Sequence, residues 1–179
     1  LMGSIIVLYL VYVKYRERKA EITKLLLFSF VFITFALFFL LLSRQTYYRF
    51  NVEEMDPNSP KGWVMFRIGF YRPAFICVIV AGYYIYLFKN KVFEKEEKKR
   101  TKSILIVASI VIVFYQVLVF EVGNDWYDVV AFLLVFLYFN VILFPFAISS
   151  FKLYLRLEEG KYKKAILSLI GMSISFIIW

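Results

Sequence analysis

Long uncharged apolar runs alternate with short charged segments along the chain. Three of these runs are uninterrupted: residues 25–43, 103–120 and 129–151 contain 19, 18 and 23 residues without a charge. An α-helix that rises about 1.5 Å per residue needs about 20 apolar residues to cross a hydrocarbon layer of about 30 Å. The lengths of the three runs therefore predict membrane-spanning helices.

Three further runs complete the pattern. Residues 73–88 carry no charge, and this run reaches a spanning length if it begins near Ile68 and includes Arg72. The chain starts with Leu, and residues 1–13 and 165–179 are apolar up to its two ends, so we interpret them as truncated helices of a longer product. One transmembrane domain, residues 1–179, is then predicted with six helices, at about 1–13, 25–43, 66–88, 103–120, 128–151 and 165–179.

The first run has a second interpretation, as a secretory signal peptide. Such a peptide carries its basic residues before the apolar stretch and small residues at a cleavage site. Here the basic cluster, Lys14–Lys19, follows the apolar stretch. This order favours a membrane helix that ends in the cytoplasm.

The composition agrees with a membrane protein. Hydrophobic residues make up 62% of the chain, against roughly 45–50% in soluble domains. Backbone polar groups in lipid have to be paired within helices or within a closed barrel. Because the runs are continuously apolar and do not alternate, the predicted fold class is all-α: a polytopic α-helical bundle.

The charges are distributed unevenly between the connections. Residues 14–24, 89–102 and 152–164, the first, third and fifth connections, carry 17 of the 22 Lys and Arg residues. Short loops rich in Lys and Arg stay on the cytoplasmic side. We therefore expect a multi-pass protein of the cell membrane, with these loops inside and the N-terminus outside.

The same distribution explains the net charge of +9. Basic loops at the inner surface attract anionic lipids of the inner leaflet, which contribute about 1 kcal/mol per cation. The lipid bilayer and its anionic lipids are thus the expected partners, and a nucleic acid is not.

A group of ionisable residues is expected at the outer boundary of the membrane. Charged side chains at membrane depth are costly and often mark function. Arg72 is the one candidate inside a predicted span, with Arg67 one turn before it. The group is completed by carboxylates at the same level, so the candidate ligand-binding residues are Arg67, Arg72, Glu121, Asp125 and Asp128.

Two interpretations of this group remain open. The functional one is an outward-facing site for an anionic ligand or a lipid headgroup. The structural one is an arginine that extends along its helix to the interface, paired with Glu121 for structure alone. Asp125 also fits as the N-cap of the following helix.

A second set of residues is expected to serve helix packing. Asn140 and Gln116 lie within predicted spans, where an amide usually bonds to a neighbouring helix, and Pro145 is expected to bend its helix. Gly171 and Ser175 are four residues apart, a spacing that permits close approach of two helices.

No catalytic constellation is visible. The chain has no histidine, and its one cysteine, Cys77, lies inside a predicted span. A nucleophile with a base, a metal cluster or a buried carboxylate pair cannot be assembled, although Asp125 and Asp128 leave a remote chance of carboxylate chemistry. We expect no enzyme activity, no cofactor and no metal.

The sequence therefore favours a non-enzymatic membrane module. It would be the input region of a sensor or receptor, or a structural subunit of a larger complex, with other membrane subunits or a second copy as partners. A component of a transporter or channel is the alternative. The sensor requires an outer cavity at Arg67 and Arg72, whereas transport requires a polar path that reaches Asn140 and Gln116 from both sides.

Overall fold

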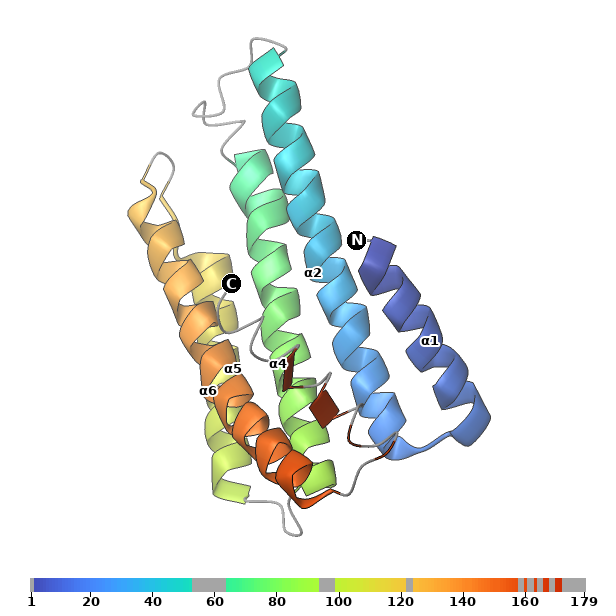
Figure 1. Cartoon of the computed structure of the whole chain (residues 1–179). Helices are drawn as coiled ribbons and strands as arrows, with labels where there is room; N and C mark the ends of the chain where they lie inside the picture. The colour runs from blue at the N-terminus through green and yellow to red at the C-terminus, as the bar shows by residue number, and fades with distance from the viewer. Residues whose placement is uncertain are drawn as a thin grey trace.

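The computed structural model describes residues 2–52, 64–93, 99–121, 124–157 and the single positions 160, 163, 166, 167, 170 and 171. Within these residues the secondary structure is helical, and no strand occurs. The elements are α1 (Met2–Arg18), α2 (Glu21–Val52), the π-helix η1 (Val64–Tyr71), α4 (Arg72–Phe93), α5 (Lys99–Leu118) and α6 (Trp126–Arg156) (Figure 1).

Four helical segments are long and apolar enough to cross a membrane. They are Glu21–Gln45, Arg67–Phe93, Lys99–Leu118 and Trp126–Arg156, with mean hydropathies of 2.9, 1.5, 2.0 and 2.5. The described part of the chain is thus all-helical, as the runs predict, and its long apolar helices indicate a membrane protein.

The helices extend beyond the apolar runs on which the prediction rests. The third predicted helix begins as η1 and continues as α4, and α6 runs from Trp126 to Arg156 through Pro145. Backbone hydrogen bonds continue past the hydrocarbon layer into the charged flanks, so apolar runs underestimate helix length. The sixth predicted helix, 165–179, falls largely outside the described residues.

Successive helices run in opposite directions. The last turns of α1, α4 and α6 and the first turns of α2 and α5 lie at one end of the bundle, the lower end in Figure 1. These are the helix ends that flank the three basic connections. The ends of α2 and α5 and the beginnings of η1 and α6 lie at the opposite end.

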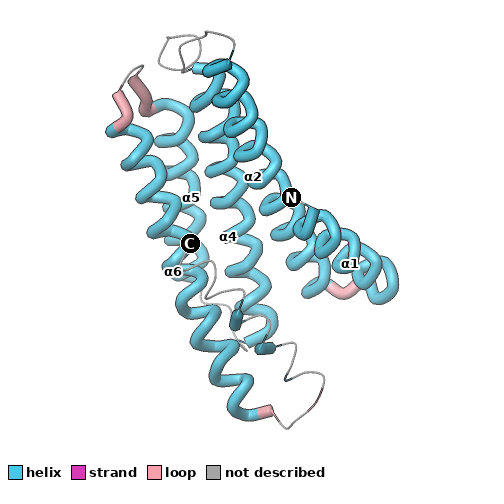
Figure 2. Tube along the Cα trace, turned by 45° about the horizontal axis from the view of Figure 1, so that its top comes forward, coloured by secondary structure: helices cyan, strands magenta, loops and turns pink. Residues whose placement is uncertain are grey.

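Helix α4 lies in the middle of the bundle. It packs along most of α2 on one side and contacts α5 and α6 on the other. Helix α1 contacts α2 and diverges from the bundle, as the turned view shows (Figure 2). The bundle proper therefore consists of α2, α4, α5 and α6.

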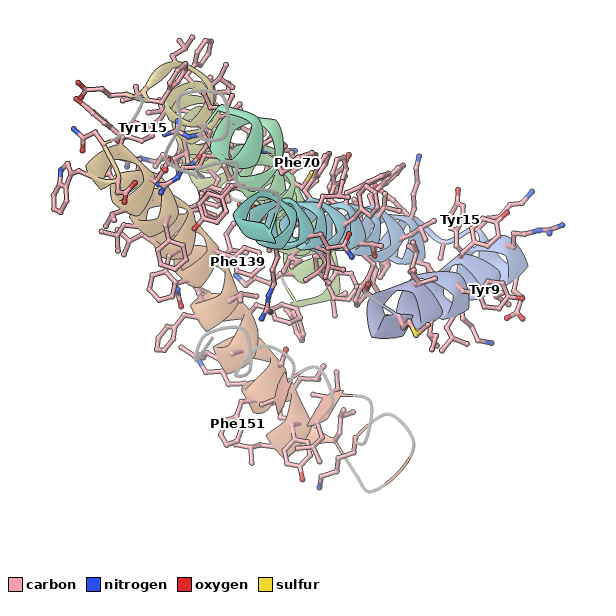
Figure 3. The ribbon with its side chains drawn as sticks, turned by 90° about the horizontal axis from the view of Figure 1, so that it is seen from above. Tyr9, Tyr15, Phe70, Tyr115, Phe139 and Phe151 are labelled. Atoms are coloured by element: carbon pink, nitrogen blue, oxygen red, sulfur yellow. The ribbon has the colours of Figure 1, made fainter. Side chains whose placement is uncertain are left out.

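Large apolar side chains cover the outside of the bundle. Val107, Val111 and Phe114 of α5 are each about 60% exposed, and Tyr9 and Phe151 point away from the bundle when it is seen from above (Figure 3). Water-soluble monomers rarely expose such extended apolar surface. This surface is suited to contact with lipid.

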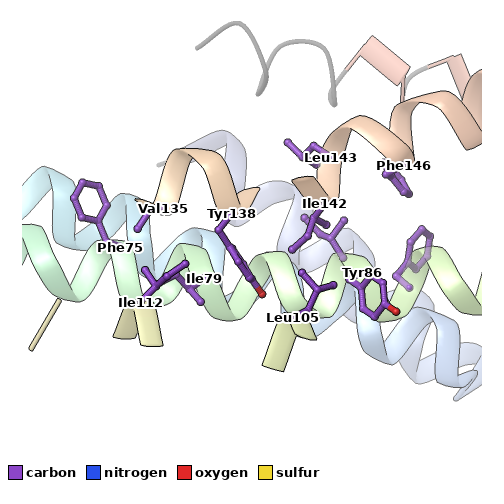
Figure 4. Packing of buried hydrophobic residues seen from close by; sticks show 12 residues of the cluster. Phe75, Ile79, Tyr86, Leu105, Ile112, Val135, Tyr138, Ile142, Leu143 and Phe146 are labelled. Carbon is purple, nitrogen blue, oxygen red and sulfur yellow. The ribbon is translucent and has the colours of Figure 1, made fainter. Parts of the chain in front are cut away.

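The core lies between α4, α5 and α6. Ile79 and Tyr86 of α4 pack with Ile112 of α5 and with Ile142 and other residues of α6 (Figure 4). Gly82 permits a close approach of α4 and α6, because a Cβ added there would lie 3.0 Å from Phe139 Cδ2. The core residues extend from Phe75 near the start of α4 to Phe88 near its end, so they join the three helices along most of their length.

Candidate functional site

Arg72 is the first residue of α4 and lies inside the bundle. It is 1% exposed. Its Nε and Nη2 donate hydrogen bonds to Oδ1 of Asp128 at 3.2 and 2.9 Å. A buried guanidinium is tolerated when a carboxylate and further acceptors satisfy it, and Asp128 supplies the carboxylate from the first turn of α6.

The third nitrogen of Arg72 caps α5. Its Nη1 donates to the backbone carbonyls of Gln116 and Val119, at 2.9 and 2.7 Å. The last carbonyls of a helix have no partner within the helix, and the negative end of the helix dipole favours a cation there. Arg72 thus joins α4 to both α5 and α6, and the expected extension toward the interface is wrong.

Arg67 lies one turn before Arg72, within η1, and is shared between two carboxylates. Its Nη1 is 2.5 Å from Oδ2 of Asp128 and 2.6 Å from Oδ1 of Asp125. The Asp128 side chain is 8% exposed, whereas that of Asp125 is 71% exposed. The two ion pairs of Arg67 therefore differ strongly in their contact with solvent.

Asp125 takes the N-cap position of α6, but its side chain makes no capping hydrogen bond. Its backbone carbonyl accepts the amides of Asp128 and Val129, each at 3.1 Å, and its carboxylate turns to Arg67. The expected N-cap position is observed, and the expected side-chain capping is not, because the guanidinium competes for the carboxylate.

Glu121 lies apart from this group. It is exposed, and its Oε2 accepts a hydrogen bond from Asn124 Nδ2 at 3.1 Å. The expected Glu121 pair is therefore wrong, since Asp128 takes this role with Arg72. Helix α5 ends at Leu118, so Glu121 follows the helix and does not share the buried face that Gln116 occupies.

A cleft of about 460 Å³ opens beside Arg67. Its charged lining comes from η1 and from the start of α6, and its apolar lining from both elements. The lining residues are Arg67, Tyr71, Asp125, Asp128, Val129 and Phe132. With Arg72 behind Asp128, two cations face two anions among the described residues of the site.

The chain offers signals for two residues that the sequence analysis missed. Phe132 follows Asp128 by four residues, which places both on one face of α6. Tyr71 directly precedes Arg72, and its ring contacts that of Phe75 at 4.5 Å. A π-helix is rare and recurs at functional sites, but no sequence pattern marks η1.

The residues expected to serve packing behave differently from one another. Gln116 is 1% exposed, and its Nε2 donates to the carbonyl of Ala131 in α6 at 3.0 Å. Its Oε1 is buried without a partner among the described residues. Asn140 donates to Phe136 in its own helix, at 2.9 Å, and this differs from the expected bond to a neighbouring helix.

The predicted contact of Gly171 and Ser175 stays a prediction. Among the described residues a Cβ at Gly171 would meet nothing within 4 Å, and Ser175 lies outside them. The close helix contact occurs at Gly82, between α4 and α6. A glycine within an apolar run is the signal that could have identified it.

The part of the chain that is described contains no group of three or more His, Cys, Asp or Glu arranged to hold a metal ion. It does contain an ion pair with an exposed carboxylate, Arg67 with Asp125, beside the buried pair of Arg72 and Asp128. Comparisons with protein families, curated proteins and solved structures found no significant match to the chain.

Proposed function

We propose that the chain is a non-enzymatic, multi-pass protein of the cell membrane that acts as the input module of a sensor or receptor. Its ligand carries an anionic group, which Arg67 binds at the cleft. The observation that carries this proposal is the position of Arg67, shared between an exposed carboxylate and a buried one.

The orientation follows from the basic connections. The helix ends that flank them lie at one end of the bundle, and Lys- and Arg-rich loops stay in the cytoplasm. In this orientation the N-terminus and the cleft face outward. Anionic lipids of the inner leaflet bind the basic end of the bundle.

An anion can take the place of Asp125 at small cost. An ion pair whose carboxylate is 71% exposed contributes about 0–1 kcal/mol, because water solvates the released carboxylate. Asp128 keeps Arg72 as its partner throughout. The ligand thus replaces Asp125 as the partner of Arg67 and leaves the buried pair of Arg72 and Asp128 in place.

A displacement of Arg67 can be transmitted to three helices, α4, α5 and α6. Arg67 belongs to η1, which continues directly into α4, and Asp128 connects it to Arg72 and so to the end of α5. A ligand shifts a conformational equilibrium by its difference in affinity for the two states. Binding at the cleft would therefore alter how α5 and α6 lie at their basic ends.

A structural subunit of a larger complex is the second candidate function. The pairing of Arg72 with Asp128 and with the end of α5 favours it, since a buried hydrogen-bonded network stabilises the bundle without any ligand. Other membrane subunits or a second copy would then cover the apolar outer surface. Transport has less support, because the cavity around Asn140 is lined mainly by aliphatic and aromatic residues.

The test measures whether an anion at the cleft moves the basic end. Spin labels are attached at Lys99→Cys and Arg156→Cys in a Cys77→Ser background, and the protein is placed in nanodiscs of zwitterionic lipid. Methyl phosphate is the probe. We expect it to shift the distance distribution between the labels.

Three variants make this test specific. Arg67→Gln should abolish the response, and Asp125→Asn should reach the half-maximal response at a lower methyl phosphate concentration because the competing carboxylate is gone. Glu121→Gln removes the same charge outside the cleft and should leave the response unchanged. An unchanged distance at saturating methyl phosphate would contradict the sensor proposal and leave the structural subunit.

A further inference from the structure

A row of aromatic rings leads from the charged cleft into the bundle. The ring of Tyr71 contacts Phe75 at a centroid distance of 4.5 Å, Phe75 lies 6.1 Å from Phe132, and Phe132 stacks on Phe136 at 6.0 Å. Tyr71 lines the cleft, and Phe136 lines a second, deeper cavity. The aromatic row therefore connects the two.

The deeper cavity lies between α2, α4 and α6 and has a volume of about 140 Å³. Phe132 belongs to the lining of both cavities. The remaining lining residues are Ile33, Ala36, Leu37, Leu40, Phe75, Val78, Val135, Phe136, Phe139 and Asn140. Phe139 lies in the angle between α6 and the pair of α2 and α4 (Figure 3).

This cavity is suited to an apolar occupant. Water needs two to four polar partners, and a lining that is apolar apart from Asn140 offers it few. Asn140 is the polar residue in the lining, and its Nδ2 already donates to Phe136. A hydrocarbon chain loses no hydrogen bonds on entry.

The two cavities also lie at the depths that an amphiphile requires. The candidate membrane-crossing segment Arg67–Phe93, which combines the end of η1 with α4, begins at Arg67, which places the cleft at headgroup level in the proposed orientation. The deeper cavity is lined by residues of the same segment farther on, Phe75 and Val78, and by the middle of α2. Along the membrane normal, the charged cleft is thus followed by the apolar cavity.

We propose that the ligand is an anionic amphiphile, a phosphate or carboxylate group with one alkyl chain. Its headgroup binds Arg67, and its chain passes Phe132 into the cavity between α2, α4 and α6. This inference rests on the proposed anion site and names the class of molecule that fills it. Both a single-chain membrane lipid, such as lysophosphatidic acid, and a free fatty acid or alkyl phosphate have this chemistry.

The first experiment compares two probes that share a headgroup. Decyl phosphate and methyl phosphate are titrated against the full chain in nanodiscs. The readout is the fluorescence of Trp126, which lies at the start of α6, in a background in which Trp63 and Trp179 are replaced by Phe. Decyl phosphate should bind more tightly than methyl phosphate, and Arg67→Gln should weaken both.

A matched pair of variants distinguishes binding of decyl phosphate in the cavity from its simple partition into the lipid. Leu40 lines the cavity, whereas its neighbour Leu41 is 39% exposed on the outside. Leu40→Phe fills the cavity, and we expect about tenfold weaker binding of decyl phosphate. Leu41→Phe adds the same ring on the lipid side and should bind decyl phosphate as the parent does.

A second measurement needs no variant. Decyl phosphate with a photoreactive group at the end of its chain should label residues 33–40 and 132–140, as read by mass spectrometry of peptides. Labelling spread equally over the lipid-facing surface of α5 would overturn the amphiphile site. Labelling competed by palmitate as well as by lysophosphatidic acid would show that free and membrane-resident amphiphiles share the site, whereas competition by lysophosphatidic acid alone would identify a membrane lipid.

The outcomes distinguish this inference from the proposal on which it rests. If methyl phosphate binding depends on Arg67 while Leu40→Phe and Leu41→Phe bind decyl phosphate equally, the anion site stands and the chain site is refuted. If neither phosphate depends on Arg67, both are refuted.

Discussion

Replacing Asp128 by asparagine removes the buried anion on which both arginines converge. The amide keeps the shape of the carboxylate, but it carries no charge and presents one acceptor oxygen. Arg72, which is 1% exposed, then remains buried without a counter-ion, although the carbonyls of Gln116 and Val119 still accept its Nη1.

The expected loss is large. Breaking a buried ion pair by removing one partner costs about 3–5 kcal/mol. In a chain of 150–250 residues, 1 kcal/mol corresponds to about 2–4 °C in the unfolding midpoint, so Asp128→Asn should lower the midpoint by about 6–20 °C. Asp125→Asn removes an exposed partner, costs about 0–1 kcal/mol, and should shift the midpoint by less than about 4 °C.

The single cysteine provides the assay. Cys77 is half-buried in α4, so a thiol-reactive fluorophore reports unfolding when the helix separates from its neighbours. Purified protein in detergent is heated with the dye, and the midpoints of the two Asn variants are compared with that of the parent. Glu121→Gln, which removes an exposed carboxylate outside the group, is the charge control and should unfold with the parent.

Equal midpoints for Asp128→Asn and Asp125→Asn would refute the reasoning. They would mean that burial of the Arg72–Asp128 pair makes no difference to stability. A double variant, Arg72→Met with Asp128→Leu, gives a further test. It should recover only part of the loss, because in the double variant the carbonyls at the end of α5 lose the donor that Arg72 still supplies in Asp128→Asn.

Three further predictions concern packing and orientation. Gly82→Ala should cost about 1–3 kcal/mol, since its Cβ would meet Phe139 at 3.0 Å, while Gly69→Ala, which meets nothing within 4 Å, should cost less than the Gly82 change in the same thermal assay. Gln116→Leu should change stability by less than about 1 kcal/mol, because the loss of one interhelical hydrogen bond, about 0.6 kcal/mol, is offset by removal of an Oε1 that has no partner among the described residues; a large loss would show that Oε1 has a partner outside them. In intact cells, a membrane-impermeant maleimide should label Asn124→Cys and not Lys99→Cys in a Cys77→Ser background, and the reverse pattern would invert the orientation.

Part of the candidate site could be anticipated from residue type and position. An arginine at the edge of an apolar run is expensive unless it is paired, and the carboxylates available at that level were few. This reasoning identifies four residues of the site: Arg67, Arg72, Asp125 and Asp128. Their pairing did not follow, because it depends on where α5 ends and on which face of α6 turns inward.

The helix packing was harder to anticipate. In lipid, apolar residues can face either a neighbouring helix or the bilayer, so hydrophobicity does not identify the buried face. Asn140 illustrates the difficulty, since its amide found an acceptor one turn back in its own helix. Gly82 shows it as well, since its role depends on the approach of α6.

The sequence by itself determined that the chain is helical and built for a membrane, because the length of an uncharged run and the cost of an unpaired backbone group in lipid leave few alternatives. Only the tertiary structure decided that Asp128, and not Glu121, lies under Arg72, that Arg67 is shared with an exposed carboxylate, and that an apolar cavity continues from the cleft. The reason is geometric: these contacts join residues up to 61 positions apart, and the relative rotation of the helices selects which of them meet.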